Sequence, residues 1–529
     1  MTTSDFLDAR DRRSIFAALE KGIHDLVVIG GGITGAGIAR DAALRGLSVV
    51  LVEARDYASG TSSRSSKMIH GGLRYLAQGD VALVREAASE RQVLRRIAPH
   101  LTRLSPFLMP TTSMALVAKL RAALWTFEKL GGVPESERHE VIDAAELARR
   151  EPLVRRGGLN GAIIYPEFLT DDARLVLANI RAAKAAGAKV INHAEVIELI
   201  TENGQASGVV VRSSLAREDL GARVRGRLIV NAAGAWVDAV RGLEQGQGDT
   251  RLSVSRGIHL VFHRARLPVT STVILRAPDK RNIFAVPRGR FTYVGTTDVF
   301  QQTADYWPAA SRDDIDYLLR TVEATLDTSP LGDEDIVALW SGVRPLIAQP
   351  NKKANEVSRK DEVWTSPSGL ISIAGGKLSA YRAMAERVVD TVVERLGRAA
   401  RACSTADLIL PGGDTVDGLE GIDALTAERL AGLYGSEASE IVRDGGDVAA
   451  EARRAVTTEG AATLEDYWVR RSARAWFGDG AGLAALAPAA VAMGNLLRWS
   501  PEERAAQIAA CQSIEKESRR ALAPAANGE

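Results

Sequence analysis

The sequence predicts an α/β protein in three parts: a parallel sheet flanked by helices, an inserted antiparallel sheet, and a helical C-terminal part. Three observations lead to this prediction. Over residues 25–53, a short apolar run, a glycine-rich turn, helical periodicity and a second apolar run follow one another. Residues 252–298 alternate apolar and polar side chains between turn signals. Beyond residue 417 nearly every segment has helical periodicity.

Residues 25–53, DLVVIGGGITGAGIARDAALRGLSVVLVE, have the order of a dinucleotide-binding unit. Three glycines fill the G-x-G-x-x-G pattern: Gly30, Gly32 and Gly35. The first permits a sharp turn, the second lets backbone approach a pyrophosphate, and the third lets the next helix pack on the strand. That helix presents its positive end to the phosphates. Glu53, after the second strand, is placed to bind a ribose diol, which disfavours NADP and leaves NAD or FAD.

Composition narrows the class of protein. A chain of 529 residues is expected to form two or three domains, and a formal net charge of +1 argues against nucleic-acid binding. The two cysteines, Cys403 and Cys511, form no C-x-x-C pair, so we predict a reduced, cytosolic setting and no metal site. Residues 1–24 have no secretory h-region and read as a polar extension ending in a helix. The longest uncharged stretch, between Asp479 and Arg498, suits a soluble helix pair.

A segment rich in hydroxyl groups follows Glu53: RDYASGTSSRSSKMIHGGLRYL, residues 55–76. Its composition is compatible with a flexible loop. The alternative is a cofactor clamp, because hydroxyls and backbone amides in an irregular segment can line a pyrophosphate or a ring edge. Together with the glycine motif, this segment closely resembles the FAD-dependent glycerol-3-phosphate dehydrogenases of the aerobic, respiratory type. The resemblance implies FAD and a Rossmann-like domain of the glutathione-reductase type.

Three distant segments extend the resemblance. Asn231 to Trp236, NAAGAW, is similar to the family's N-A-T-G-P-W turn, with Ala233 and Ala235 in place of Thr and Pro. GVRPL around Arg344 and GGKLxxYR from Gly375 also match. The motif and the resemblance together predict these cofactor-binding residues: Gly30, Gly32, Gly35, Glu53, Thr61, Ser62, Ser63, Ser66, Lys67, His70, Gly71, Val196, Ala233, Gly234, Trp236, Gly342, Gly376, Lys377 and Leu378.

Oxidation of a secondary alcohol by FAD requires a hydride acceptor, a base for the hydroxyl proton, and a grip on the rest of the substrate. A phosphate dianion should be bound by several cationic side chains from separate segments. The resemblance implies catalytic roles for His259, Arg344 and Lys377. His259 is our first choice as base, and Arg344 or Lys377 could instead stabilise a developing alkoxide. The implied substrate-binding residues are Arg74, Tyr75, Thr296, Asp298 and Arg359.

The predicted activity is oxidation of sn-glycerol 3-phosphate to dihydroxyacetone phosphate by hydride transfer to FAD N5, with electrons passed to a membrane quinone. The alternatives are an oxidase that reduces O2 to peroxide, another FAD-dependent amine or amino-acid oxidase, and a flavin-bound protein without activity. We predict an extension over 1–24 and a discontinuous FAD-binding domain over 25–403. A substrate domain is interleaved with it at about 80–160 and 250–345, and a helical domain covers 404–529.

The helix expected near residues 114–127 indicates where in the cell the protein lies. Its apolar stripe with a basic flank can pack on the protein itself or lie on a membrane surface. The resemblance favours the membrane, so we predict a cytoplasmic protein attached peripherally to the inner face of the cell membrane. The oligomeric state is left open, with a homodimer as one option. The stripe consists of Met114, Val117, Leu120, Leu124, Trp125 and Phe127.

Overall fold

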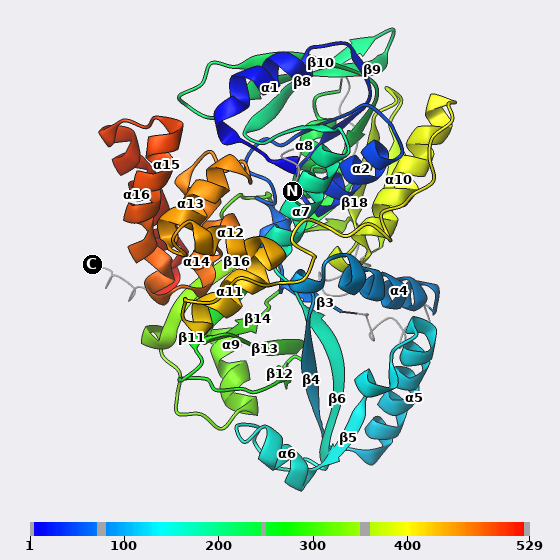
Figure 1. The fold of residues 1–529 in the computed structure, drawn as a ribbon. Helices are drawn as coiled ribbons and strands as arrows, with labels where there is room; N and C mark the ends of the chain where they lie inside the picture. Colours follow the sequence, from blue (N-terminus) through cyan, green and yellow to red (C-terminus); the bar gives the residue numbers. More distant parts are fainter. Residues whose placement is uncertain (1–4, 71–80, 245–249, 350–359, 523–529) are drawn as a thin grey trace, which may run out of the picture.

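The computed structural model describes residues 5–70, 81–244, 250–349 and 360–522. Two sheets organise these residues (Figure 1). In the view of Figure 1, the first sheet lies in the upper half, the second sheet lies below it, and the C-terminal helices lie along one side of both. The predicted α/β class, with a helical C-terminal part, is confirmed.

The first sheet has the strand order β17-β18-β10-β1-β2-β7, and its central strands from β18 to β7 are parallel. β8 pairs with β9, and β9 pairs with β10. Helices α2, α7 and α10 pack together over this sheet, while α1 contacts β10 and β7. The bounds are α1 Arg12–Leu19, β1 Ile23–Ile29, α2 Ile33–Leu44, β2 Val49–Val52, α7 Asp172–Ala185, β7 Lys189–Ile191, β8 Ala194–Glu202, β9 Gln205–Ser213, β10 Gly221–Asn231, β17 Asp361–Thr365, β18 Ile371–Gly375 and α10 Tyr381–Leu396.

The second sheet has the order β15-β11-β14-β13-β12-β4-β6-β3, with β16 paired to β11 and β5 to β6. Its strands reach beyond the predicted ranges, because β3 precedes residue 80 and β6 follows residue 160. Helix α9 packs on it through a core around Ile315 and Leu318. The bounds are β3 Met68–Ile69, α4 Val81–Ile97, β4 Arg103–Thr111, α5 Met114–Gly131, β5 Glu140–Asp143, α6 Ala144–Arg150, β6 Gly161–Leu169, β11 Leu252–His263, β12 Thr272–Arg276, β13 Asn282–Arg288, β14 Phe291–Gly295, β15 Val299–Gln301, α9 Arg312–Thr325 and β16 Ile336–Ile347.

The C-terminal part begins after an irregular linker over residues 397–423. Side chains of Asp423, Asp447 and Ser500 accept hydrogen bonds from amides in the first turns of three of its helices, which explains where those helices start. A π-helical turn spans Asp466–Arg471. The helices are α11 Ala424–Tyr434, α12 Ala438–Arg443, α13 Val448–Thr457, α14 Arg474–Phe477, α15 Leu486–Leu497 and α16 Pro501–Ser518.

One described stretch, Asp479–Leu497, is long and apolar enough to cross a membrane, with a mean hydropathy of 1.5. Half of it is buried within the protein, however, which makes it weak evidence for a span. Its backbone also turns left-handed at Gly480, Ala481 and Gly482 before α15 begins. The buried side chains of α15, including Leu486 and Met493, belong to a core that the C-terminal part shares with the second sheet.

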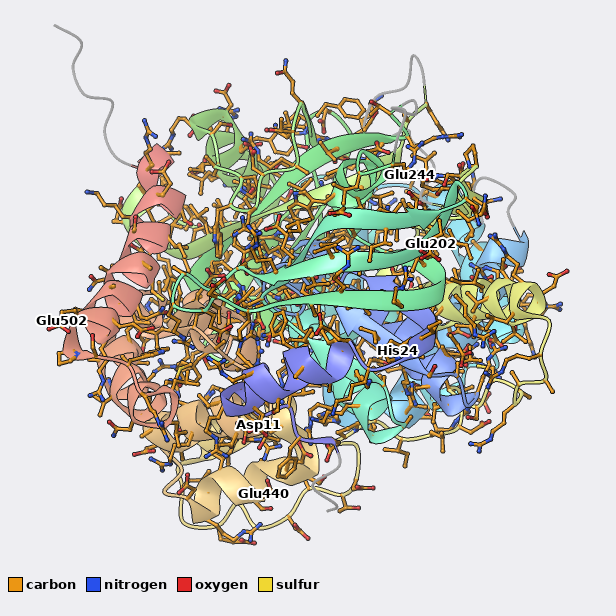
Figure 2. The ribbon with its side chains drawn as sticks, turned by 90° about the horizontal axis from the view of Figure 1, so that it is seen from above. Asp11, His24, Glu202, Glu244, Glu440 and Glu502 are labelled. Atoms are coloured by element: carbon orange, nitrogen blue, oxygen red, sulfur yellow. The ribbon has the colours of Figure 1, made fainter. Side chains whose placement is uncertain are left out.

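The N-terminal residues connect the first sheet to the C-terminal part. Leu7 forms a β-bridge with Glu459, and the short turn Ala9–Asp11 contacts α13 and α15. Figure 2 shows the turn at Asp11 lying near the helix that carries Glu440. The guanidinium of Arg12 donates to the backbone carbonyls of Asn192 and His193 at 2.8 and 3.0 Å. The predicted polar extension is therefore packed onto the protein.

Candidate active site

The carboxyl ends of four neighbouring strands, β18, β10, β1 and β2, bring together the predicted cofactor segments. The glycine turn after β1 is tight. Gly30 has φ +110, and a Cβ on Gly35 would lie 1.9 Å from the Gly30 carbonyl oxygen. Gly32 is the N-cap of α2. Because glycine has no side chain, a phosphate can reach the backbone amides at this end of the helix.

Glu53 lies at the end of β2, directly over the glycine turn. Its carboxylate accepts hydrogen bonds from the amides of Gly31 at 2.6 Å and Arg55 at 2.9 Å. Burial raises the pKa of this carboxyl, while the two amides lower it. The geometry matches the predicted role, because the carboxylate reaches from the second strand to the turn.

The hydroxyl loop, residues 59–67, connects the two sheets. On the first sheet's side, Ser62 Oγ accepts from the Ile33 amide at 3.0 Å and so caps α2. On the second sheet's side, Thr61 Oγ1 donates to the Val343 carbonyl at 2.6 Å, and Tyr293 Oη donates to the Ser66 carbonyl at 2.9 Å. A Cβ on Gly342 would lie 2.7 Å from the Arg64 carbonyl oxygen. The loop can therefore pack this closely on β16 only because residue 342 is a glycine. The loop is anchored at both ends, unlike a flexible loop.

Lys67 has a different environment from the one its predicted role suggests. Its ammonium donates to Asp172 at 2.6 Å and to the Ser63 carbonyl at 2.9 Å, and its side chain is 2% exposed. The charge is therefore neutralised within the protein. A contact of Lys67 with the cofactor through its backbone stays a prediction.

The remaining predicted cofactor residues lie on several elements, and those that follow β10 and β18 share the same edge. Ala233 and Gly234 follow β10, and the indole of Trp236 packs over Gly60, where a Cβ would lie 2.8 Å from the ring. Val196 lies in β8, and His70 follows β3. Gly376, Lys377 and Leu378 follow β18. The sequence predicted a helix from Lys377, but α10 begins at Tyr381, after a 3-10 turn at Leu378–Ala380. The positive end of the α10 dipole therefore lies about one turn beyond the predicted position.

These residues fit FAD. The glycine turn leaves the start of α2 open to a pyrophosphate, and Glu53 can accept hydrogen bonds from a ribose. Ser63 Oγ is buried and has no hydrogen-bond partner within the described residues, as expected of a polar atom whose partner comes from a bound ligand. Four predicted site residues, Gly71, Arg74, Tyr75 and Arg359, lie outside the described residues.

A second cluster of predicted residues lies on the second sheet, around Arg344 of β16. Its guanidinium donates to Thr296 Oγ1 at 2.9 Å and contacts Asp298 at 3.2 Å. Ser255 Oγ donates to the same Asp298 oxygen at 2.7 Å. A Cβ on Gly257 would lie 2.2 Å from the guanidinium, so the arginine lies flat over β11 at that glycine. The structure thus brings Arg344, Thr296 and Asp298 together as predicted.

His259 lies two residues further along β11, on the same face as Gly257. Its imidazole is 2% exposed, stacks on Trp340 with 4.6 Å between ring centroids, and has Nε2 2.9 Å from Ser66 Oγ. Burial, followed by the charges of Arg344 and Lys67, holds the pKa of His259 well below its usual range. The ring is therefore neutral near pH 7, and Ser66 links it to the hydroxyl loop.

Comparison with known proteins identifies the family. A family model described as FAD dependent oxidoreductase matches residues 25–382, and one described as C-terminal domain of alpha-glycerophosphate oxidase matches residues 403–504. The aerobic glycerol-3-phosphate dehydrogenase of Bacillus subtilis is 38% identical over 501 residues, which cover 88% of this chain and 90% of that protein. The chain belongs to the FAD-dependent glycerol-3-phosphate dehydrogenase family. Its cofactor is FAD.

Further comparisons agree in family or in fold. The aerobic glycerol-3-phosphate dehydrogenase of Staphylococcus saprophyticus is 37% identical over 505 residues, covering 89% of this chain and 90% of that protein. The crystal structure of glycerol-3-phosphate dehydrogenase from Bacillus halodurans, complexed with FAD, has a TM-score of 0.82 and 32% identity, over 99% of this chain and 100% of that one. The L-alpha-glycerophosphate oxidase of Mycoplasma pneumoniae shares the fold, with a TM-score of 0.55 and 16% identity over 74% of this chain and 99% of that one.

Sequence reasoning missed one set of contacts in this glycerol-3-phosphate dehydrogenase family member. Arg64, inside the hydroxyl loop, is 4% exposed, and its guanidinium lies 3.8 Å from the ring centroid of Trp307 and 4.7 Å from that of Tyr306. Burial lowers the pKa of Arg64 to about 10. No local pattern marks Tyr306 and Trp307, because they follow the short edge strand β15 in an irregular segment.

Proposed function

We propose that the protein oxidises sn-glycerol 3-phosphate to dihydroxyacetone phosphate. The observation that carries the proposal is the pair formed by Arg344 and His259 on one face of β11. The guanidinium lies over Gly257 and the imidazole projects from residue 259, so they are about 7 Å apart along the strand. A three-carbon phosphate is long enough to contact both groups at once. A fixed cation beside a neutral base suits an anionic substrate that must lose a hydroxyl proton.

In this proposal the Arg344 guanidinium binds the phosphate through two hydrogen bonds. Its hydrogen bonds to Asp298 and Thr296 fix its orientation. His259 takes the hydroxyl proton at Nε2. Because the imidazole is buried and Ser66 is only half-buried, the proton reaches Nε2 through Ser66 Oγ. When bound, FAD supplies the acceptor for the hydride. Lys377, at the end of β18, adds positive charge on the cofactor's side of the site.

Anaerobic mixing with substrate tests this proposal. Loss of the yellow flavin absorbance on adding sn-glycerol 3-phosphate, with no loss on adding glycerol, would support a phosphate-dependent alcohol oxidation. Bleaching by glycine or proline instead would favour the amine or amino-acid oxidase alternative. No bleaching by any of these compounds would contradict the proposed reaction.

For the electron acceptor we propose a membrane quinone, because the family resemblance implies one and the relatives are named dehydrogenases, not oxidases. The rival is O2, and it is favoured by the match of residues 403–504 to the C-terminal domain of alpha-glycerophosphate oxidase. A short-chain quinone should reoxidise the reduced enzyme at least about tenfold faster than air-saturated buffer, with little peroxide formed. Stoichiometric peroxide without added quinone would contradict the dehydrogenase assignment.

We further propose that the protein is cytoplasmic and docks peripherally on the inner face of the cell membrane through α5. Three members of the sequence-predicted stripe face inward: Val117, Leu124 and Phe127 are 5%, 2% and 3% exposed. Two other members of the stripe, Met114 and Trp125, lie on the exposed side of the helix and are 67% and 58% exposed. Four further exposed residues lie between or beside them at helical spacing: Ala118, Arg121, Ala122 and Lys129. Apolar and cationic side chains on one exposed face favour an anionic lipid surface.

The Met114→Ser, Trp125→Ser double variant tests the docking face. Binding to vesicles containing anionic lipid should fall at least about tenfold, because both apolar contacts are lost. The control is a Leu425→Ser, Val491→Ser variant, which removes similarly exposed apolar residues from the C-terminal part. Equal cosedimentation of wild type and both variants would contradict docking through α5.

A further inference from the structure

A buried charge cluster connects the C-terminal part to the strand end that carries Glu53. The interdomain charge cluster consists of Asp56, His193, Asp466, Arg470 and Arg471. The Arg471 guanidinium donates two hydrogen bonds to the Asp56 carboxylate, at 2.5 and 2.8 Å. It also donates to the Glu459 carbonyl. Arg470 donates to both Asp56 and Asp466. His193 Nε2 lies 2.9 Å from Asp466 Oδ2.

All five side chains are shielded from water. Asp56, Asp466 and Arg471 are fully buried, and Arg470 is 1% exposed. The two carboxylates are balanced by two guanidinium groups. Although donor atoms of Asp56, His193 and Asp466 lie within 4.8 Å of one another, a divalent ion there would meet two positive charges already bound to the carboxylates. The cluster is therefore a set of interdomain ion pairs.

The cluster contacts the backbone that positions Glu53. After β2, the Glu53 amide donates to the Ile191 carbonyl at 3.0 Å, and the His193 amide donates to the Arg55 carbonyl. Asp56 also accepts from the Asn192 side chain at 2.8 Å. The segments after β2 and β7 are thus bonded to each other, and Arg470, Arg471 and Asp466 hold both from the C-terminal side.

The same segment supports the glycine turn. The Ala58 amide donates to the Gly31 carbonyl at 3.0 Å, and a Cβ on Gly31 would lie 2.9 Å from the Tyr57 ring. Glu53 accepts from the amides of Gly31 and Arg55, as described above. A shift of residues 55–58 would therefore move both the carboxylate and the turn that would hold the adenosine half of FAD.

A second link reaches the hydroxyl loop. Arg470 Nη1 lies 3.2 Å from Tyr306 Oη, and that hydroxyl donates to Glu465 at 2.6 Å. Tyr306 in turn packs against Arg64 of the hydroxyl loop. Through Arg470, the C-terminal part thus contacts supports of two separate cofactor segments.

We propose that the C-terminal part acts as a cofactor-retention element, in which Arg470 and Arg471 are positioning residues that set the affinity for FAD. The inference depends only on FAD as the cofactor, not on the substrate or the electron acceptor. Loss of the Arg471 fork should loosen residues 55–58 and weaken FAD binding while leaving the Arg344 and His259 face unchanged.

The test compares Arg471→Gln with a matched control, Arg181→Gln. Arg181 is likewise buried, with 2% of its surface exposed, and it also forms an interdomain ion pair, with Glu437. Its described ion pairs, with Glu437 and Asp5, involve no cofactor segment. Apoprotein is titrated with FAD, and quenching of flavin fluorescence gives Kd. We expect Arg471→Gln to raise Kd for FAD about tenfold or more, a size known from loss of supporting hydrogen bonds at metal sites. Arg181→Gln should stay within about threefold of wild type.

Thermal unfolding of apoprotein and FAD-saturated protein distinguishes positioning from general destabilisation. The gap between the two melting temperatures should shrink in Arg471→Gln and persist in Arg181→Gln, since the gap reports the affinity for FAD. If Arg471→Gln does not accumulate as folded protein, Asp56→Asn, which preserves the shape of the side chain, provides the same measurement. Unchanged Kd in Arg471→Gln or Asp56→Asn, or an equal rise in Arg181→Gln, would overturn the proposal.

Discussion

Replacing Arg344 by Met is expected to lower kcat/KM for glycerol 3-phosphate about 100- to 1000-fold. A guanidinium that binds a phosphate with two charged hydrogen bonds contributes about 3 to 4 kcal/mol, and the substrate dianion would lose that partner. The loss should fall mainly on KM, because the phosphate is bound in both the ground and the transition state. Steady-state kinetics over a wide range of substrate concentration measures the effect.

Two controls separate substrate binding from damage to the sheet. Removal of Arg344 leaves Asp298 without its cation, so part of any loss could reflect destabilisation. Arg256→Met breaks a comparable ion pair, with Asp314, on the neighbouring β11, and should change KM less than about threefold. Arg344→Lys keeps the charge but loses the fork and should give an intermediate KM. A KM unchanged in Arg344→Met would exclude this arginine from the phosphate site.

Replacing His259 by Ala is expected to slow reduction of the bound flavin by substrate about 100-fold or more, the range typical of a general base. Rapid mixing without oxygen isolates this step from reoxidation. Ser66→Ala should slow the same step, because its hydroxyl carries the proton to Nε2. The two effects should not add in the double variant, since both residues serve one proton path. Fully additive losses would contradict the relay.

The pH profile provides an independent check on His259. Because burial and the nearby cations lower its pKa, the imidazole stays unprotonated well below pH 6.5. The rate of flavin reduction should therefore hold between pH 8 and about pH 6, and fall only at lower pH. In the unfolded chain the same group titrates near pH 6.5, so its depressed pKa should make the folded protein less stable as the pH falls below that value. A rate that halves near pH 6.5 would indicate an ordinary, exposed histidine.

Local signals explain what the sequence could predict. The strand before the glycine turn, the turn itself and the second strand are encoded within residues 25–53, and β2 occupies Val49–Val52 as predicted. The assembly of Arg344, Thr296 and Asp298 followed from the family resemblance. In each of these cases, residues close in sequence, or a matched motif, carry the information.

Contacts between distant segments explain what the sequence could not predict. In the sequence, Arg470 and Arg471 are as compatible with surface charges as with a site, but they lie buried against Asp56, more than 400 residues earlier. The helical periodicity of α5 correctly places Val117 and Leu124 on one apolar face. It does not indicate that α4 and the second sheet cover that face. For Lys67, no local pattern indicated Asp172 as its partner.

The anchoring of the hydroxyl loop has a consequence for how the enzyme acquires FAD during synthesis. The glycine turn and the loop leave the ribosome early, but the β16 glycine that receives the loop is Gly342, and the arginines that hold Asp56 come after residue 469. At about 5–20 residues per second, tens of seconds separate the first half of the site from its last supports. Until these residues are made, the nascent chain lacks the contacts that hold its cofactor segments, so we expect stable FAD loading to follow their synthesis.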